Sequence, residues 1–265
     1  MLDLFQSLSP LYLGLIGSLV AGLGTGLGAL PILFVQQITE RVQGALLGFG
    51  AGVMLAATSF SLVIPSLEAA TSGADKHQFT GATIVVIGIL LGGAFLWFSH
   101  QYFPHEHFGK GPEGENLKNL KRIWLFVTAI AIHNFPEGLA VGVGFGGNDF
   151  ANGTALTVGI GLQNLPEGFV VAIALLTENY SRLSAFGIAL LTGLVEPLGG
   201  LIGVGIVSTA ESILPWAMAF AAGAMLFVIS DEIIPESHSL GHEKEATVGV
   251  MLGFVVMMFL DVTLS

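Results

Sequence analysis

The stretch that decides the fold is Ile123–Gly146, with the sequence IWLFVTAIAIHNFPEGLAVGVGFG. Close behind it, Gly153–Thr177 has the sequence GTALTVGIGLQNLPEGFVVAIALLT. Each stretch exceeds the roughly 20 apolar residues that a helix needs to cross a bilayer. Each also carries Asn-x-Pro-Glu-Gly near its centre, which puts a carboxylate at mid-membrane depth. Such a group is expensive there unless it is paired or binds a metal ion, so both stretches are predicted to be functional spans.

Six further stretches have the same apolar character, and the whole chain is 53% hydrophobic and only 10% charged. A soluble domain would carry about a quarter charged residues. We therefore predict an all-α membrane protein in which residues 1–265 form a single transmembrane domain within a lipid bilayer. The eight predicted transmembrane helices are Leu11–Val35, Gly44–Leu67, Thr80–Phe103, Ile123–Gly146, Gly153–Thr177, Leu183–Ser208, Ile213–Pro235 and Ala246–Leu264.

Composition excludes several kinds of site. The net charge of -11 argues against a nucleic-acid partner, because phosphate binding needs a basic surface. The absence of cysteine excludes disulfides, thiolate catalysis and thiolate metal sites. The glycine run from Gly22 to Gly28 lacks the lysine of a phosphate loop, so its spacing predicts close helix packing instead. We expect no organic cofactor.

Basic residues predict the orientation. Seven of the eight, all except Lys76, fall in the connections after spans one, three, five and seven, among them the long loop Pro104–Arg122. The positive-inside rule makes these connections cytoplasmic and both termini extracytoplasmic. The first basic residue is Arg41, so the first apolar stretch is expected to remain as a span rather than act as a cleaved signal peptide.

Two internal repeats indicate an inverted architecture. Ala51–Leu55 in the second span resembles Ala222–Leu226 in the seventh, and His133–Gly138 in the fourth resembles Gln163–Gly168 in the fifth. The members of each pair run in opposite directions in the predicted topology. Such repeats are typical of transporters with a site near the midplane. We predict that helices 1–3 and 6–8 form an inverted repeat around a central antiparallel pair, helices 4 and 5.

The repeated motif predicts a metal site. His133 and Glu137 are four residues apart and so share a helix face, and Gln163 and Glu167 repeat that spacing on the partner helix. If the two helices pack antiparallel, an imidazole, two carboxylates and an amide oxygen converge. This set suits zinc, iron or manganese better than calcium. The alternative is that the neighbouring prolines are packing kinks and the two glutamates share a structural proton.

Four other mid-span residues are weaker candidates. Glu196, beside a proline in the sixth span, either binds a second ion and relays protons or is a protonated packing residue. Asn134 and Asn164 either face that second site or join helices by hydrogen bonds. Met54 either adds a thioether ligand or fills the core.

Acidic residues also cluster at the inner end of the seventh span. Asp231, Glu232 and Glu236 lie there with His238. They form either a mouth that concentrates cations or ordinary solvated helix ends.

At these residues the chain resembles the ZIP family of zinc and iron transporters, in its bacterial branch. The resemblance rests on His133–Gly138 and Gln163–Gly168, is supported by Glu196-Pro197 and Ala221–Pro235, and covers nearly the whole chain. It implies uptake of a divalent metal ion, zinc first, through the bacterial inner membrane, and a homodimer as the assembly.

The resemblance also implies two ligand sets. One comprises His133, Glu137, Gln163 and Glu167 with Met54. The neighbouring set comprises Asn134, Asn164 and Glu196 and shares the two glutamates. Some family members carry an aspartate where this chain has Asn164, which makes the second site less acidic here.

Two other functions stay open from the sequence. An intramembrane metallohydrolase of the zincin type needs two histidines on one helical turn, whereas His133 is the single mid-membrane histidine. A proton-coupled carrier of another solute would use buried Glu and His as a relay, but no mid-membrane basic or aromatic group is placed to hold an anion or a ring. Bound metal in the purified protein separates both from a metal transporter.

Overall fold

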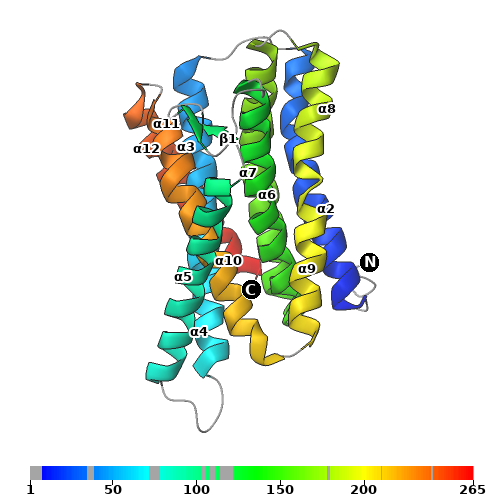
Figure 1. Cartoon of the computed structure of the whole chain (residues 1–265), viewed down its shortest axis with the longest axis vertical. Helices are drawn as coiled ribbons and strands as arrows, with labels where there is room; N and C mark the ends of the chain where they lie inside the picture. Colours follow the sequence, from blue (N-terminus) through cyan, green and yellow to red (C-terminus); the bar gives the residue numbers. More distant parts are fainter. Residues whose placement is uncertain are drawn as a thin grey trace.

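The structure is a computed structural model that describes residues 8–34, 39–71, 78–102, 105–107, 111–113, 122–177, 180–209, 211–239 and 241–264. Long helices run along the vertical axis of Figure 1, with α6 and α7 at the centre of the view. The helices are α2 (Pro10–Ala29), α3 (Glu40–Ala57), α4 (Ile64–Thr71), α5 (Gln78–Tyr102), α6 (Arg122–Gly146), α7 (Phe150–Thr177), α8 (Arg182–Gly193), α9 (Glu196–Thr209), α10 (Leu214–Val228), α11 (Ile234–Ser239) and α12 (Glu243–Leu264).

These helices group into the eight predicted spans. Seven segments have the length and hydropathy of membrane spans in their described residues, and the eighth, α6, is 25 residues long. Helices suit a bilayer because they satisfy every backbone polar group internally. The all-α membrane fold is therefore confirmed. A small addition is an antiparallel ribbon in the long loop, in which β1 (His105–His107) pairs with β2 (Gly111–Glu113).

Three of the spans are interrupted, and prolines explain where. A π-helical turn at Thr58–Val63 joins α3 to α4, and another at Ile229–Ile233 joins α10 to α11. Each turn comes just before a proline, Pro65 or Pro235, whose ring cannot sit against the carbonyl four residues earlier. The predicted sixth span consists of α8 and α9, which meet at a turn beside Glu196.

Helix packing follows the predicted inverted repeat. The first span packs on the fifth (α2 on α7) and the sixth packs on the fourth (α9 on α6). Likewise the second span packs on the eighth (α3 on α12) and the seventh packs on the third (α10 on α5). Exchanging spans 1–3 for 6–8, and span 4 for span 5, converts each contact into its counterpart. The central pair α6 and α7 is also in contact.

Small residues allow this packing, as the glycine run predicted. A Cβ atom added to Gly24 of α2 would lie 2.6 Å from the carbonyl oxygen of Gly161 on α7. One added to Gly28 would lie 1.9 Å from the carbonyl oxygen of Leu165. The backbones of α2 and α7 are therefore in direct contact at these points, which only glycine allows.

Candidate metal site

The four residues predicted as the main ligands lie on the two central helices. His133 and Glu137 are on α6, Gln163 and Glu167 are on α7, and all four are buried. Both helices continue through the internal prolines Pro136 and Pro166 without a break. The four-residue spacing therefore holds, and each helix presents its pair on one face.

A hydrogen bond joins the two motifs. The side-chain amide of Gln163 donates from Nε2 to Oε1 of Glu137 at 2.6 Å. The two motif helices thus meet at their polar residues, as the antiparallel arrangement predicts. The carboxylate of Glu137 also interacts electrostatically with those of Glu167 and Glu196.

Several buried oxygens in this cluster lack a hydrogen-bond partner among the described residues. They are Glu137 Oε2, Gln163 Oε1, Glu167 Oε1 and Glu196 Oε2. An unsatisfied polar atom in a low-dielectric interior is costly, and a buried carboxylate more so. A divalent cation or protons would remove that cost. The arrangement is therefore suited to binding a metal cation or protons.

Met54 lies beside this cluster. Its side chain is buried on α3 and lines a cavity of about 10 Å³, which is roughly the space of one water molecule. The other lining residues are Leu46, Leu47, Gly50, Gln163, Pro166, Glu167 and Ile233. The structure thus places Met54 beside two of the four main candidates, and Met54 also belongs to the apolar core of the bundle.

The second predicted group is brought together in part. Asn164 donates from Nδ2 to Oε1 of Glu196 at 2.6 Å and also to the carbonyl oxygen of Ala21 at 2.9 Å. Glu196 is completely buried at the start of α9. Asn134 is buried too, and both polar atoms of its side chain lack a hydrogen-bond partner among the described residues. Asn164 therefore joins α7 to α2 by a hydrogen bond and also binds the side chain of Glu196.

The glycine of the first motif positions Glu196. A Cβ atom on Gly138 would lie 2.0 Å from the carbonyl oxygen of Glu196, and one on Gly199 would lie 2.4 Å from that of Phe135. Helix α9 therefore lies directly against α6. This close approach keeps the third carboxylate within electrostatic range of Glu137 and Glu167.

The structure corrects the expectation for the seventh span. Glu232 and Glu236 are not solvated helix ends but buried side chains. Glu232 Oε2 is in direct contact with His133 Nε2. Glu167 interacts electrostatically with both glutamates. The helical span continues to Ser239, beyond the predicted end at Pro235, so both glutamates lie inside the span rather than at its end.

A sequence signal for these two residues exists. Glu232 and Glu236 are four residues apart with Pro235 between them. His133 with Glu137, and Gln163 with Glu167, have the same spacing and the same proline position. The seventh span therefore carries a third copy of the polar-x-x-Pro-Glu pattern.

The interior is strongly acidic. The buried polar residues of the described part of the chain include Glu137, Glu167, Glu196, Glu232 and Glu236, and include no lysine or arginine. Within the same part, no group of three or more His, Cys, Asp or Glu side chains is already arranged as a metal cluster. A bound ion would have to displace the hydrogen bond between Gln163 and Glu137 and draw the ligands together.

Comparison with known proteins identifies the relatives of the chain. The sequence profile described as ZIP Zinc transporter matches residues 104–261. Zinc transporter GufA of Myxococcus xanthus is 49% identical over 252 residues, which cover 95% of this chain and 99% of that protein. Zinc transporter ZIPB of Bordetella bronchiseptica is 46% identical over 242 residues, which cover 91% and 78%.

A more distant relative extends the similarity beyond bacteria. Zinc transporter ZIP11 of Homo sapiens is 34% identical in an alignment of 343 residues that covers 99% of this chain and 100% of the human protein. The family profile spans more than half of the chain, and the bacterial relatives are similar over nearly all of it. Together with the paired Pro-Glu-Gly motifs at the centre of eight spans, these matches show that the chain belongs to the ZIP zinc transporter family.

Proposed function

We propose that this protein carries Zn²⁺ across the membrane through a site built by His133, Glu137, Gln163 and Glu167. The observation that carries the proposal is the hydrogen bond between Gln163 and Glu137, which brings the two repeated motifs together in an acidic interior. The relatives are named as zinc transporters, which supports transport rather than hydrolysis.

The donor set favours zinc on chemical grounds. An imidazole nitrogen, two carboxylates and an amide oxygen are ligands that Zn²⁺ accepts in four-coordinate sites. Mg²⁺ and Ca²⁺ prefer six or more oxygen ligands, which this set does not supply. When the ion binds, the hydrogen bond from Gln163 Nε2 to Glu137 must break. The Gln163 amide then turns its oxygen to the ion, and the Glu137 carboxylate becomes a second ligand. The ion thereby compensates charge that the protein otherwise buries at a cost.

Glu232 and Glu236 extend the acidic path away from this site. Both are buried on the seventh span, and Glu236 lies one helical turn beyond Glu232. A chain of carboxylates allows an ion to exchange ligands stepwise instead of crossing a dry region as a bare charge. We assign to these residues the role of receiving the ion from His133 and Glu167.

Purified protein in liposomes tests the function. A zinc-sensitive dye inside the vesicles should report entry of Zn²⁺ that depends on the protein, with Cd²⁺ as a second substrate and little entry of Mg²⁺ or Ca²⁺. Vesicles without protein give the background. If Zn²⁺ enters no faster than in empty vesicles, over a pH range and in both directions of the gradient, the proposed function is wrong.

Glu232→Gln is expected to lower zinc uptake by about 10- to 100-fold, the usual effect of removing a carboxylate that orients a metal-binding histidine. The physical reason is the contact between Glu232 and His133. Initial uptake rates in liposomes measure the effect. Glu243→Gln is the matched control, since Glu243 is an exposed acid in the first turn of α12. Equal uptake by both variants would return Glu232 to a purely structural role.

We further propose that the chain lies in the bacterial inner membrane with both termini outside. The start of α2 and the end of α12 lie in the lower half of Figure 1, on the side where α9 gives way to α10. Helices α3, α8 and α12 begin on the opposite side. Arg41, Arg182 and Lys244 lie in their first turns, and the positive-inside rule makes this side cytoplasmic.

Single cysteines test this orientation, because the chain contains none of its own. Thr209→Cys should react with a membrane-impermeant maleimide in intact cells, whereas Glu243→Cys should react only after the membrane is permeabilised. Both positions are exposed, so accessibility within the protein does not bias the comparison. The reverse pattern would mean that the protein inserts the other way round.

A further inference from the structure

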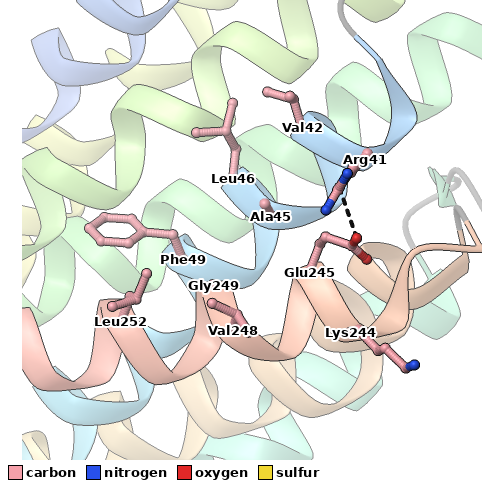
Figure 2. Close-up of a pocket in the computed structure, with 10 residues that line it drawn as sticks. All are labelled: Arg41, Val42, Ala45, Leu46, Phe49, Lys244, Glu245, Val248, Gly249 and Leu252. Atoms are coloured by element: carbon pink, nitrogen blue, oxygen red, sulfur yellow. Dashed lines mark ion pairs between the residues drawn. The ribbon is translucent and has the colours of Figure 1, made fainter.

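Two glycines of α3 are needed for its packing on α12, and Figure 2 shows these two helices side by side. Gly48 and Gly52 are four residues apart and share one face of α3. A Cβ atom on Gly48 would lie 2.2 Å from the carbonyl oxygen of Ala246, and one on Gly52 would lie 2.0 Å from that of Val250. An alanine at either position would therefore force the two helices apart.

Gly50 lies between these glycines in the sequence but faces α7 instead. It is buried, yet a Cβ atom there would make only ordinary van der Waals contacts. That atom would lie 3.8 Å from the carbonyl oxygen of Gln163, 3.9 Å from Cγ of Pro166 and 4.0 Å from Cβ of Gln163. Helix packing therefore does not require a glycine here, although glycine is unfavourable in the interior of a helix.

The missing side chain leaves free space beside the candidate zinc ligands. Gly50 lines the cavity of about 10 Å³ that Met54, Gln163 and Glu167 also line. Gly50 and Met54 are four residues apart, so they share the face of α3 that borders this cavity. A space of this size holds about one water molecule. A methyl group at position 50 would occupy much of it.

Free space at this point matters because the ligands must move when an ion binds. The hydrogen bond from Gln163 Nε2 to Glu137 Oε1 has to break. Side chains in a close-packed interior can move only where a neighbouring volume is free. A larger ion also forms longer bonds, so Gln163 and Glu167 must stand farther from its centre. The cavity beside Gly50 provides room for that displacement.

We propose that Gly50 sets the size of the ion that the site accepts. The absent side chain admits divalent ions larger than Zn²⁺, for which Cd²⁺ is the probe. This inference rests on the proposed function, because it takes Gln163 and Glu167 as ligands. It adds a residue that determines specificity without contributing a ligand atom. A side chain at position 50 confines Gln163 and Glu167 and thereby weakens the binding of Cd²⁺ more than that of Zn²⁺.

Calorimetric binding of Zn²⁺ and Cd²⁺ to the folded, purified protein tests the proposal. In Gly50→Ala the ratio of the Cd²⁺ affinity to the Zn²⁺ affinity should fall by about tenfold or more, because one methylene group in a pocket discriminates by about 10- to 200-fold. Gly50→Val should lower the ratio further. Gly205→Ala is the matched control and should keep the wild-type ratio, since Gly205 lies in α9 and a Cβ atom there meets nothing within 4 Å.

Thermal unfolding separates this role from a role in packing. Gly50→Ala should have a Tm no lower than that of the wild type, because alanine favours a helix and its methyl group fits the available space. Gly52→Ala should lower the Tm, because its methyl group meets the backbone of α12. An equally large loss of Tm in Gly50→Ala would make Gly50 a packing residue and overturn the proposal.

The binding results also distinguish this inference from the function on which it rests. If the wild type binds Zn²⁺ but the ratio of the two affinities is the same in the wild type, Gly50→Ala and Gly50→Val, the role of Gly50 is wrong and the zinc site stands. If the wild type binds neither ion, the proposed function is wrong and the role of Gly50 is wrong with it.

Discussion

Glu137→Gln and Glu167→Gln are each expected to abolish zinc uptake while the protein still folds and inserts. Each change removes a ligand charge and leaves the shape of the side chain intact. Folding should survive, because neutralising a buried acid removes a desolvation cost. The zinc affinity should fall by more than about 100-fold, beyond the loss caused by residues that only orient a ligand. Calorimetric zinc binding to folded protein, together with uptake in liposomes, measures both effects.

The comparison variants and the pH dependence sharpen this test. Gln163→Ala should be milder, since a neutral amide contributes less to holding a cation than a carboxylate does. In the wild-type protein, zinc affinity should fall as the pH is lowered, because protons compete with the metal for the same carboxylates and imidazole. Glu243→Gln, on the exposed start of α12, should bind zinc like the wild type. Near-normal binding and transport by both central variants would return Glu137 and Glu167 to a structural role.

The fold was predictable because the bilayer imposes a simple rule on the sequence. A span must be a long apolar helix, so hydropathy alone locates all eight segments to within a few residues. The interruptions were harder to predict. A proline such as Pro235 indicates that the helix is perturbed near that point, but whether the chain responds with a kink or a π-helical turn depends on its neighbours.

The meeting of the two repeated motifs was predictable for a related reason. A four-residue spacing determines a helix face without any tertiary information, and an acid at mid-membrane is rare enough to mark function. Glu232 escaped this reasoning because it lies close to the predicted end of its span, where acids are common. In the structure α10 packs against α6, and Glu232, in the π-helical turn after α10, contacts His133.

Gly168→Ala is expected to move α7 away from α2 and thereby to displace the proposed zinc ligands on α7. A Cβ atom at Gly168 would lie 1.9 Å from the carbonyl oxygen of Thr25, and a backbone atom cannot rotate away as a side chain can. The two helices must therefore move apart. Overpacking of this kind costs about 1–3 kcal/mol or more, which corresponds to a Tm lower by about 5 °C.

The same displacement should weaken zinc binding, although Gly168 contributes no ligand atom. Asn164 is held by the carbonyl of Ala21 on α2, and Glu167 immediately precedes Gly168 on α7. Thermal unfolding in detergent and zinc calorimetry measure the two effects. Gly187→Ala is the control: this glycine lies in helix α8, and a Cβ atom there meets nothing within 4 Å. If Gly168→Ala keeps both the Tm and the zinc affinity of Gly187→Ala, the motif glycine is not needed for close approach. If both fall, the third residue of Pro-Glu-Gly positions the carboxylate by letting the neighbouring backbone come into contact.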